Sequence, residues 1–193
     1  MLRIAVEADV PAMLAVYAPY ILTTTCSFEY EVPSQEEFLN RFRTITAQVP
    51  WLVWEEDGEV LGYAYGSLPF ERAAYAWCAE SSVYLKPEAR GRGIGKKLYM
   101  ALEAILAEQG YRRNYAIITS ENAASVAFHR KMGYKLTAEF PDCGYKFGRW
   151  LGVFWMEKEL EAVGNDGISP VSWHSLRQIE RKISDILDNL SLS

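Results

Sequence analysis

The sequence predicts one domain of the mixed α/β (α+β) class, followed by a short C-terminal extension. Two patterns predict this class: short apolar strand patterns alternate with segments of helical period, and a glycine-rich loop separates the longest strand pattern from a helix. The composition agrees, because 193 residues, 50% hydrophobic and 23% charged, can build one sizeable core and fit neither a disordered chain nor a coiled coil.

The first part of the chain predicts two helices and three strands. A helix is expected to begin at Asp9, a candidate N-cap, and a second at Ser34, where Ser34 and Glu37 match a capping box. The dipeptide Asp57-Gly58 indicates a tight hairpin turn. The expected elements are strand 2–6, helix 9–21, helix 34–47, strand 51–55 and strand 60–67.

The rest of the domain predicts four strands and two helices. Gly110 and Gly133 are natural C-terminal stops for the helices, and Pro87 closes a long strand rich in aromatic and β-branched residues. The expected elements are strand 75–85, helix 94–108, strand 115–119, helix 123–132, strand 134–140 and strand 152–160.

The run Gly-Asn-Asp-Gly at residues 164–167 marks the end of the compact domain. We therefore expect a domain over residues 1–163 and an extension over residues 164–193, with an amphipathic helix at 172–190. The apolar stripe of this helix fits a helix folded back on its own domain as well as an inter-subunit contact. Its members are Leu176, Ile179, Ile183, Ile186, Leu187 and Leu190.

Charge and cysteine usage exclude several classes of protein. The net charge of −5 argues against a domain-wide nucleic-acid footprint, and no apolar run approaches the roughly 20 residues that span a bilayer. The N-terminus has no secretory signal pattern. Three widely spaced cysteines (Cys26, Cys78, Cys143) and two histidines (His129, His174) offer no disulfide framework or metal-ligand spacing. We expect a reduced, cytoplasmic protein with no metal, membrane or nucleic-acid partner.

The glycine-rich loop after the long strand is the most informative segment. It contains Arg90, Gly91, Arg92, Gly93, Ile94, Gly95 and Lys96. Such a loop presents backbone N–H groups at a helix N-terminus, which suits a phosphate, and its basic side chains add positive charge. The spacing matches neither a P-loop nor the dinucleotide-binding fingerprint. What remains is Arg-x-x-Gly-x-Gly, which begins at Arg90.

This loop resembles the acyl-CoA loop of the GNAT superfamily of N-acetyltransferases. The segment from Asn122 to Tyr134 resembles the second cofactor segment of that superfamily, in the correct order and at the correct spacing. The resemblance implies a central mixed, mostly antiparallel sheet, splayed at the acetyl-CoA site and flanked by helices. It also implies acetyl-CoA as co-substrate.

The resemblance implies a cofactor-binding set on this chain. The backbone groups of Val83, Tyr84 and Leu85 would pair with pantetheine, and one of their N–H groups would polarise the thioester carbonyl. Residues Arg90 to Lys96 would hold the pyrophosphate. Asn122 would hydrogen-bond the pantetheine arm, and Ser125 and Phe128 would flank its channel.

A closer similarity is to the phosphinothricin and methionine sulfoximine acetyltransferase branch. It extends from about Arg3 to Leu160 and rests on segments such as Pro50-Trp51-Leu52-Val53, Asp57-Gly58-Glu59-Val60, Ala79-Glu80-Ser81-Ser82-Val83-Tyr84 and Gly144-Tyr145-Lys146. The branch acetylates the α-amino group of small amino-acid analogues, which implies direct transfer in a ternary complex. It also suggests a homodimer.

The acceptor side needs a proton acceptor and a group that binds a carboxylate. Glu80 is the candidate base, because it lies in an otherwise uncharged strand and a positioned base contributes roughly 10²–10⁴-fold. A guanidinium binds a carboxylate through two parallel hydrogen bonds, and Arg72 is matched by the substrate-binding Arg of the branch. Phe28, Tyr75 and Ser82 complete the expected acceptor site. The alternatives are a solvated or ion-paired carboxylate for Glu80, a solvated loop charge for Arg72, and plain core packing for Phe28 and Tyr75.

Three positions differ from the patterns of the family. Phe70 and Phe147 replace a basic residue and a His of the phosphinothricin enzymes, which favours a methionine sulfoximine or sulfone type of acceptor. His129 replaces the Tyr that protonates the leaving thiolate in many GNAT members, and it is either that acid or a packed, hydrogen-bonded residue. Protein N-terminal or polyamine acetylation and a non-catalytic acyl-CoA-binding module remain the alternative functions.

Overall fold

A computed structural model of the protein describes residues 1–161, 167–176, 181 and 185. Its described strands form one sheet in the order β1-β2-β3-β4-β5-β7-β6. The strands are β1 (Leu2–Ile4), β2 (Trp51–Glu56), β3 (Glu59–Ser67), β4 (Cys78–Leu85), β5 (Arg113–Thr119), β6 (Lys135–Lys146) and β7 (Arg149–Glu159). Every neighbouring pair is antiparallel except β4 and β5, which are parallel, so the expected mixed, mostly antiparallel sheet is confirmed.

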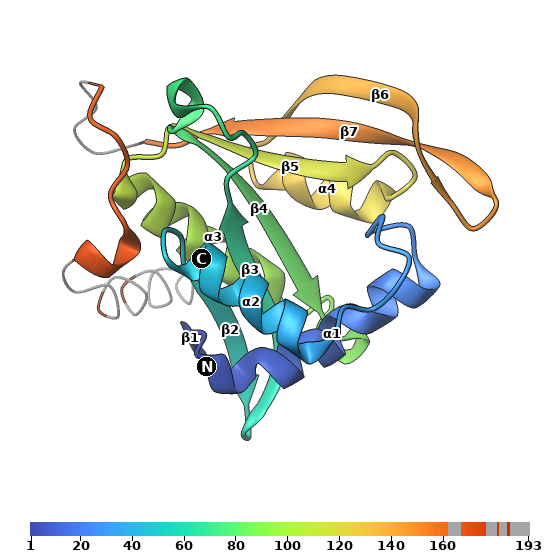
Figure 1. Ribbon diagram of the computed structural model, residues 1–193, viewed down its shortest axis with the longest axis horizontal. Coiled ribbons are helices and arrows are strands. Elements are labelled where there is room, and N and C mark those ends of the chain that lie inside the picture. The colour runs from blue at the N-terminus through green and yellow to red at the C-terminus, as the bar shows by residue number, and fades with distance from the viewer. Residues whose placement is uncertain (162–166, 177–180, 182–184, 186–193) are drawn as a thin grey trace.

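The sheet opens between β4 and β5. The two strands are paired only where Cys78–Glu80 faces Arg113–Tyr115, and beyond this point they diverge (Figure 1). Strand β4 continues to Leu85 along β3, and β5 continues to Thr119 along β7. The expected splay is therefore present and begins at Ser81.

Two layers of helices cover the sheet. Helices α1 (Val10–Thr23) and α2 (Gln35–Thr46) pack on one face around Trp51 and Tyr63, and α3 (Ile94–Gln109) packs on the other face around Leu52 and Ala64 (Figure 1). Helix α4 (Ala123–Lys131) covers β5 and β7. The expected flanking helices are confirmed.

The local signals for turns and helix ends are confirmed where the backbone geometry demands them. The hydroxyl of Ser34 accepts a hydrogen bond from the N–H of Glu37 at 3.2 Å, and the Glu37 carboxylate accepts one from the N–H of Ser34 at 2.7 Å. Asp57 and Gly58 have φ angles of 50° and 80°, which a tight hairpin turn requires. Gly110, with φ of 100°, ends α3.

Three local expectations are corrected. Asp9 precedes α1, but its carboxylate does not cap the helix because it accepts hydrogen bonds from the Arg3 guanidinium at 2.7 and 2.8 Å. The long strand begins at Cys78 rather than Tyr75, since Ala73–Tyr75 forms a 3₁₀ turn. Strand β6 continues past Phe140 to Lys146, because two irregularities in its register with β7 allow the pairing to resume.

The C-terminal extension contacts the domain over residues 167–176. Trp173 and Leu176 pack against the core on the α3 side, and the Trp173 indole N–H donates to the Thr46 carbonyl at 2.7 Å. The expected start of the helix at Ser172 is wrong, because Trp173–Ser175 forms a 3₁₀ turn and the backbone at Leu176 is extended. The domain boundary at 163/164 and most of the helix expected at 172–190, including Ile179, lie outside the described residues.

Candidate active site

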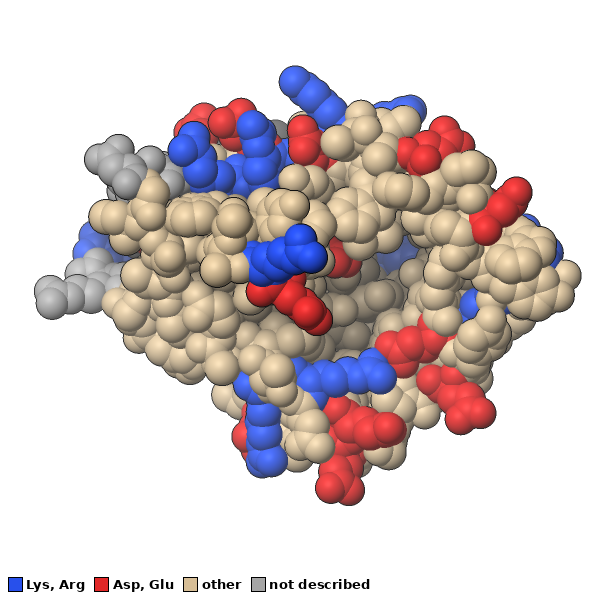
Figure 2. All heavy atoms as spheres, turned by 45° about the horizontal axis from the view of Figure 1, so that its top comes forward, with Lys and Arg blue, Asp and Glu red and all other residues tan. Residues whose placement is uncertain are grey.

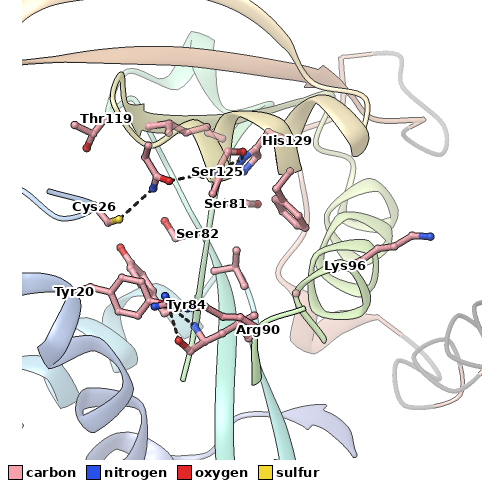
Figure 3. Close-up of a pocket in the computed structure, with 18 of the residues that line it drawn as sticks. Tyr20, Cys26, Ser81, Ser82, Tyr84, Arg90, Lys96, Thr119, Ser125 and His129 are labelled. Atoms are coloured by element: carbon pink, nitrogen blue, oxygen red, sulfur yellow. Dashed lines mark hydrogen bonds between the residues drawn. The ribbon is translucent and has the colours of Figure 1, made fainter. Parts of the chain in front are cut away.

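A pocket of about 660 Å³ lies where β4 and β5 diverge. Its walls come from the end of β4, the glycine-rich loop, β5, α4 and the end of α1 (Figure 3). The surface in Figure 2 is hollowed near its centre and carries both acidic and basic side chains around the hollow. The pocket lies at the opening of the sheet, as the sequence predicts for the cofactor.

The exposed edge of β4 has one residue whose backbone groups are open to the pocket. In an antiparallel pair, every second residue of a strand bonds its backbone to the partner strand. The Lys86 N–H bonds to the Leu61 carbonyl, so the even-numbered residues of β4 face β3 and the backbone groups of Ser81, Val83 and Leu85 face away from it. The Tyr99 hydroxyl donates a hydrogen bond to the Ser81 carbonyl at 2.9 Å. The Tyr20 hydroxyl accepts a hydrogen bond from the Leu85 N–H at 3.1 Å and donates one to the Leu85 carbonyl at 2.6 Å.

At this edge, no described side chain bonds to the N–H or the carbonyl of Val83. The backbone groups of Tyr84 point toward β3, although Tyr84 also lines the pocket. Of the three residues expected to pair with pantetheine, Val83 is therefore the one that has both backbone groups available.

The glycine-rich loop has the geometry of an anion site. Gly91 and Gly93 have φ angles of 74° and 78°, and Gly93 immediately precedes α3. The first N–H groups of α3 have no partner within the helix and face the loop. The guanidinium of Arg90 lies 5.2 Å from the centre of the Tyr20 ring at the pocket wall, and Lys96 is an exposed lysine of the same pocket.

Two loop residues face elsewhere. The Arg92 guanidinium pairs with the Glu56 carboxylate at 2.7 Å, and the Ile94 side chain is buried in the core. Only the backbone groups of Arg92 and Ile94 are therefore left for the contacts with the cofactor that the sequence predicts.

The start of α4 closes the pocket on the other side. The Asn122 side-chain oxygen accepts from the Ser125 N–H at 3.1 Å, and its amide group donates to the Cys26 sulfur at 3.1 Å (Figure 3). Ser125 and Phe128 line the same wall.

His129 lines the pocket but is almost completely buried. Its Nε2 lies 2.8 Å from the Tyr99 hydroxyl and its Nδ1 lies 2.8 Å from the Ser125 carbonyl oxygen. Burial lowers the pKa of the imidazole, and the Ser125 carbonyl partly opposes this effect. Both ring nitrogens therefore have partners in this structure.

Glu80 lies on β4 at the point where the sheet opens. Its neighbours Ser81 and Ser82 line the pocket, and its register partners are Ser67 on β3 and Tyr115 on β5. Burial raises the pKa of its carboxyl above the usual value. Among the residues that the structure describes, none forms an ion pair with this carboxylate, so it is available as a proton acceptor.

The other acceptor candidates come from two loops. Arg72 and Tyr75 are exposed on the β3–β4 loop, and the Tyr75 ring packs on Phe70 with 4.7 Å between the ring centres. Phe28 lies on the α1–α2 loop and packs on Gly144 of β6. No described contact joins these two groups.

Sequence reasoning missed Tyr20, Tyr99 and Lys146. Tyr20 belongs to an apolar helical stripe in the sequence, and Lys146 is one residue in a short family motif. Their hydroxyl and ammonium groups find partners that are distant in the chain, and no local pattern indicates these pairings.

The described residues offer neither a metal site nor a membrane-spanning helix. They contain no group of three or more His, Cys, Asp or Glu side chains that would hold a metal ion. None of the helices they form has the length and hydropathy needed to cross a membrane.

Comparison with known proteins gave consistent matches. Residues 2–155 match the acetyltransferase (GNAT) domain family. A phosphinothricin N-acetyltransferase of Alcaligenes faecalis is 36% identical over 162 residues, which cover 83% of this chain and 82% of the relative. An L-methionine sulfoximine/L-methionine sulfone acetyltransferase of Pseudomonas aeruginosa is 39% identical over 167 residues, covering 83% of this chain and 94% of the relative.

Among solved structures, a phosphinothricin acetyltransferase of the GNAT superfamily from Sinorhizobium meliloti, in complex with acetyl-CoA, superimposes with a TM-score of 0.82. It is 37% identical to this chain, and the match covers 89% of this chain and 92% of that one.

Proposed function

Since the chain belongs to the GNAT acetyltransferase family, it is an N-acetyltransferase that uses acetyl-CoA, and we propose that its acceptor is the α-amino group of a small amino-acid analogue. The acceptor is of the phosphinothricin, methionine sulfoximine or methionine sulfone type, and transfer is direct, in one ternary complex. The observation that carries the proposal is the pocket at the β4–β5 opening, which the free backbone of Val83 lines on the same strand as the partly buried, unpaired carboxylate of Glu80.

The residues of the pocket fit acetyl-CoA. The amide-containing arm of the molecule needs a backbone acceptor on a strand edge, which the Val83 carbonyl offers, and the Val83 N–H stays available for the thioester. The diphosphate needs convergent N–H donors and positive charge, which the loop after Arg90 provides. When bound, acetyl-CoA supplies an acetyl group activated as a thioester.

Glu80 removes a proton from the acceptor. An α-ammonium group is largely protonated at neutral pH and attacks a carbonyl only after it loses a proton. The carboxyl of Glu80 has a raised pKa because of burial, which brings its basicity closer to that of the amine and makes it a better proton acceptor.

Val83 and His129 act on the thioester. The Val83 N–H donates to the thioester oxygen as negative charge develops there, and one such donor is worth roughly 2.7–4 kcal/mol. His129 returns a proton to the departing thiolate, because its ring lines the pocket beside β4.

The acceptor side favours an amino acid with an apolar side chain. Arg72 binds the acceptor carboxylate through paired hydrogen bonds. Phe70 packs among Tyr75, Tyr115 and Trp155, with ring centres 4.7 to 6.0 Å apart, and so extends an aromatic surface beside this loop. This surface supports a preference for methionine sulfoximine or sulfone over phosphinothricin, which carries an additional negative charge.

Assembly and location belong to the same proposal. Four aromatic side chains on the β6–β7 hairpin are 45% to 63% exposed, which supports a homodimer that buries this surface. They are Phe140, Tyr145, Phe147 and Trp150. The three cysteines are free, as expected in the reducing cytoplasm.

A thiol-release assay tests the proposal. Acetyl-CoA is supplied with methionine sulfoximine, methionine sulfone, phosphinothricin, a peptide with a free N-terminus, and spermidine. We expect CoA release with the amino-acid analogues and the highest kcat/KM with the sulfoximine or sulfone. Preferential use of the peptide or of spermidine contradicts the acceptor assignment, and acetyl-CoA binding without release on any amine contradicts catalysis.

A further inference from the structure

A buried ammonium group lies at the end of β6. Lys146 is only 2% exposed, and its Nζ donates hydrogen bonds to the carbonyl oxygens of Ile21 at 2.7 Å, Thr24 at 3.0 Å and Ser27 at 2.6 Å. An ammonium group has three N–H donors, so its hydrogen-bonding capacity is filled by one short segment of backbone.

This ammonium caps helix α1 from a remote strand. Ile21 belongs to the last turn of α1, where carbonyl groups lack partners within the helix and the helix dipole favours a positive charge. No described carboxylate lies within ion-pair distance of Lys146, so backbone carbonyls balance most of its charge. Their geometry therefore depends on this one side chain.

Gly144 contacts the same loop next to Lys146. Residues two apart in a strand point to the same face, so Gly144 lies beside Lys146 on β6. The Phe28 ring packs so closely on Gly144 that a Cβ at this position would overlap it. Lys146 and Gly144 thus hold both ends of the segment from Thr24 to Phe28.

The segment held in this way is a wall of the active site. Thr24 lines the pocket together with Cys26, which Figure 3 labels, and Phe28 is an expected acceptor contact. On the opposite side, the Thr119 hydroxyl donates to the Thr25 carbonyl and the Asn122 amide donates to the Cys26 sulfur. The loop is therefore fixed between the β5–α4 part of the pocket and the β6–β7 hairpin.

We propose that Lys146 is a positioning residue for the acceptor site: together with Gly144 it fixes the loop from Thr24 to Phe28, and so the position of Phe28 against the acceptor. What binds there rests on the proposed function. The contacts by which Lys146 and Gly144 hold the loop, three carbonyl hydrogen bonds and the packing of Phe28, do not depend on which acceptor binds.

Replacement of Lys146 should change acceptor binding more than acetyl-CoA binding. In Lys146→Met an apolar chain of similar length leaves three carbonyls without their donor, so the loop moves. We expect the KM for the amine to rise at least about tenfold, because small displacements of positioning groups carry large effects. The Kd for acetyl-CoA should change less than the KM for the amine, because the loop reaches the cofactor pocket only at Thr24 and Cys26, whereas Val83 and the glycine-rich loop do not contact Lys146.

Three single variants, one combination with Phe28→Ala and two readouts test the proposal. Lys135→Met is the matched control, because Lys135 is an exposed lysine on the same strand. Gly144→Ala displaces Phe28 while Lys146 stays intact. If Lys146→Met does not fold, this variant still tests whether the position of the loop controls binding of the amine. The readouts are the KM and kcat for the amine and the alkylation rate of Cys26, followed by peptide mass spectrometry, which does not depend on activity.

The proposal predicts a higher amine KM and faster Cys26 alkylation in Lys146→Met and Gly144→Ala, with no change in Lys135→Met. The double variant Phe28→Ala/Lys146→Met should have nearly the same KM for the amine as Phe28→Ala alone, because both changes remove the contact between Phe28 and the acceptor. Unchanged KM and unchanged alkylation, or fully additive effects on KM, overturn it. If the wild type uses no amine, the proposed function fails, while the alkylation rates still decide whether Lys146 holds the loop.

Discussion

Replacement of Glu80 by Gln tests the proton acceptor. The amide has nearly the same shape as the carboxyl group, so the packing of β4 and the pocket at its end should persist. No described residue forms an ion pair with this carboxylate, so no partner is stranded by the change. A positioned base contributes roughly 10²–10⁴-fold, so kcat/KM should fall by at least about 10²-fold, equivalent to about 3 kcal/mol.

The pH dependence of activity in the wild type and in Glu80→Gln is a second test of the proton acceptor. Activity of the wild type should rise with pH as Glu80 loses its proton, and burial places this limb above the usual pKa of a glutamate. In Glu80→Gln the limb should disappear, and the remaining rate should follow the ionisation of the amine. The measurements are steady-state kinetics from pH 5 to 9 with a saturating amine and calorimetric binding of acetyl-CoA.

Stability should change in the opposite direction. Because folding raises the pKa of Glu80, its contribution to stability is complete below the pKa of the unfolded chain and is lost as the pH rises through the folded pKa. At pH 8 the variant should therefore melt at a higher temperature than the wild type, and the difference should vanish near pH 4. Unchanged kcat/KM with intact acetyl-CoA binding would refute the role of Glu80.

Three further changes test other parts of the account. Arg72→Ala should raise the KM for the amine about 10- to 100-fold, the range for a lost charged hydrogen-bonded pair, and an equal loss of acetyl-CoA affinity would contradict this role. Trp150→Glu puts a charge on a side chain that is 63% exposed on the hairpin surface, and light scattering should show a monomer; an unchanged dimer would place the interface elsewhere. Lys158→Met leaves the buried carboxylate of Glu103 without the ammonium that lies 2.6 Å away, and urea unfolding should show a loss of about 2 kcal/mol; no loss would mean that the Tyr134 hydroxyl suffices.

Local chemistry made most of the fold predictable from the sequence. The capping box at Ser34, the turn at Asp57-Gly58 and the helix stop at Gly110 each depend on a few adjacent residues, and the structure has all three. Asp9 shows the limit of such signals: its residue type suits an N-cap, but Arg3 binds its carboxylate instead.

The candidate site was predictable where it depends on a strand, a loop and a helix that follow one another in the chain. The segment from Val83 to Gly95 is of this kind, and its residues Val83, Tyr84, Leu85, Arg90, Gly91, Gly93 and Gly95 line the expected pocket. Lys146 is different, because the carbonyls it binds lie 119 to 125 residues earlier in the chain. Such pairings arise only when the sheet brings β6 beside the end of α1, and no periodicity or spacing in the sequence reveals them.

A crystal structure of the protein with CoA and an amino-acid acceptor tests the central claim most directly. The account predicts that pantetheine pairs with the backbone of Val83 and that the acceptor amine lies within direct or one-water hydrogen-bond reach of the Glu80 carboxylate. An amine bound beyond that reach, or a pantetheine arm that does not enter the opening between β4 and β5, would contradict it.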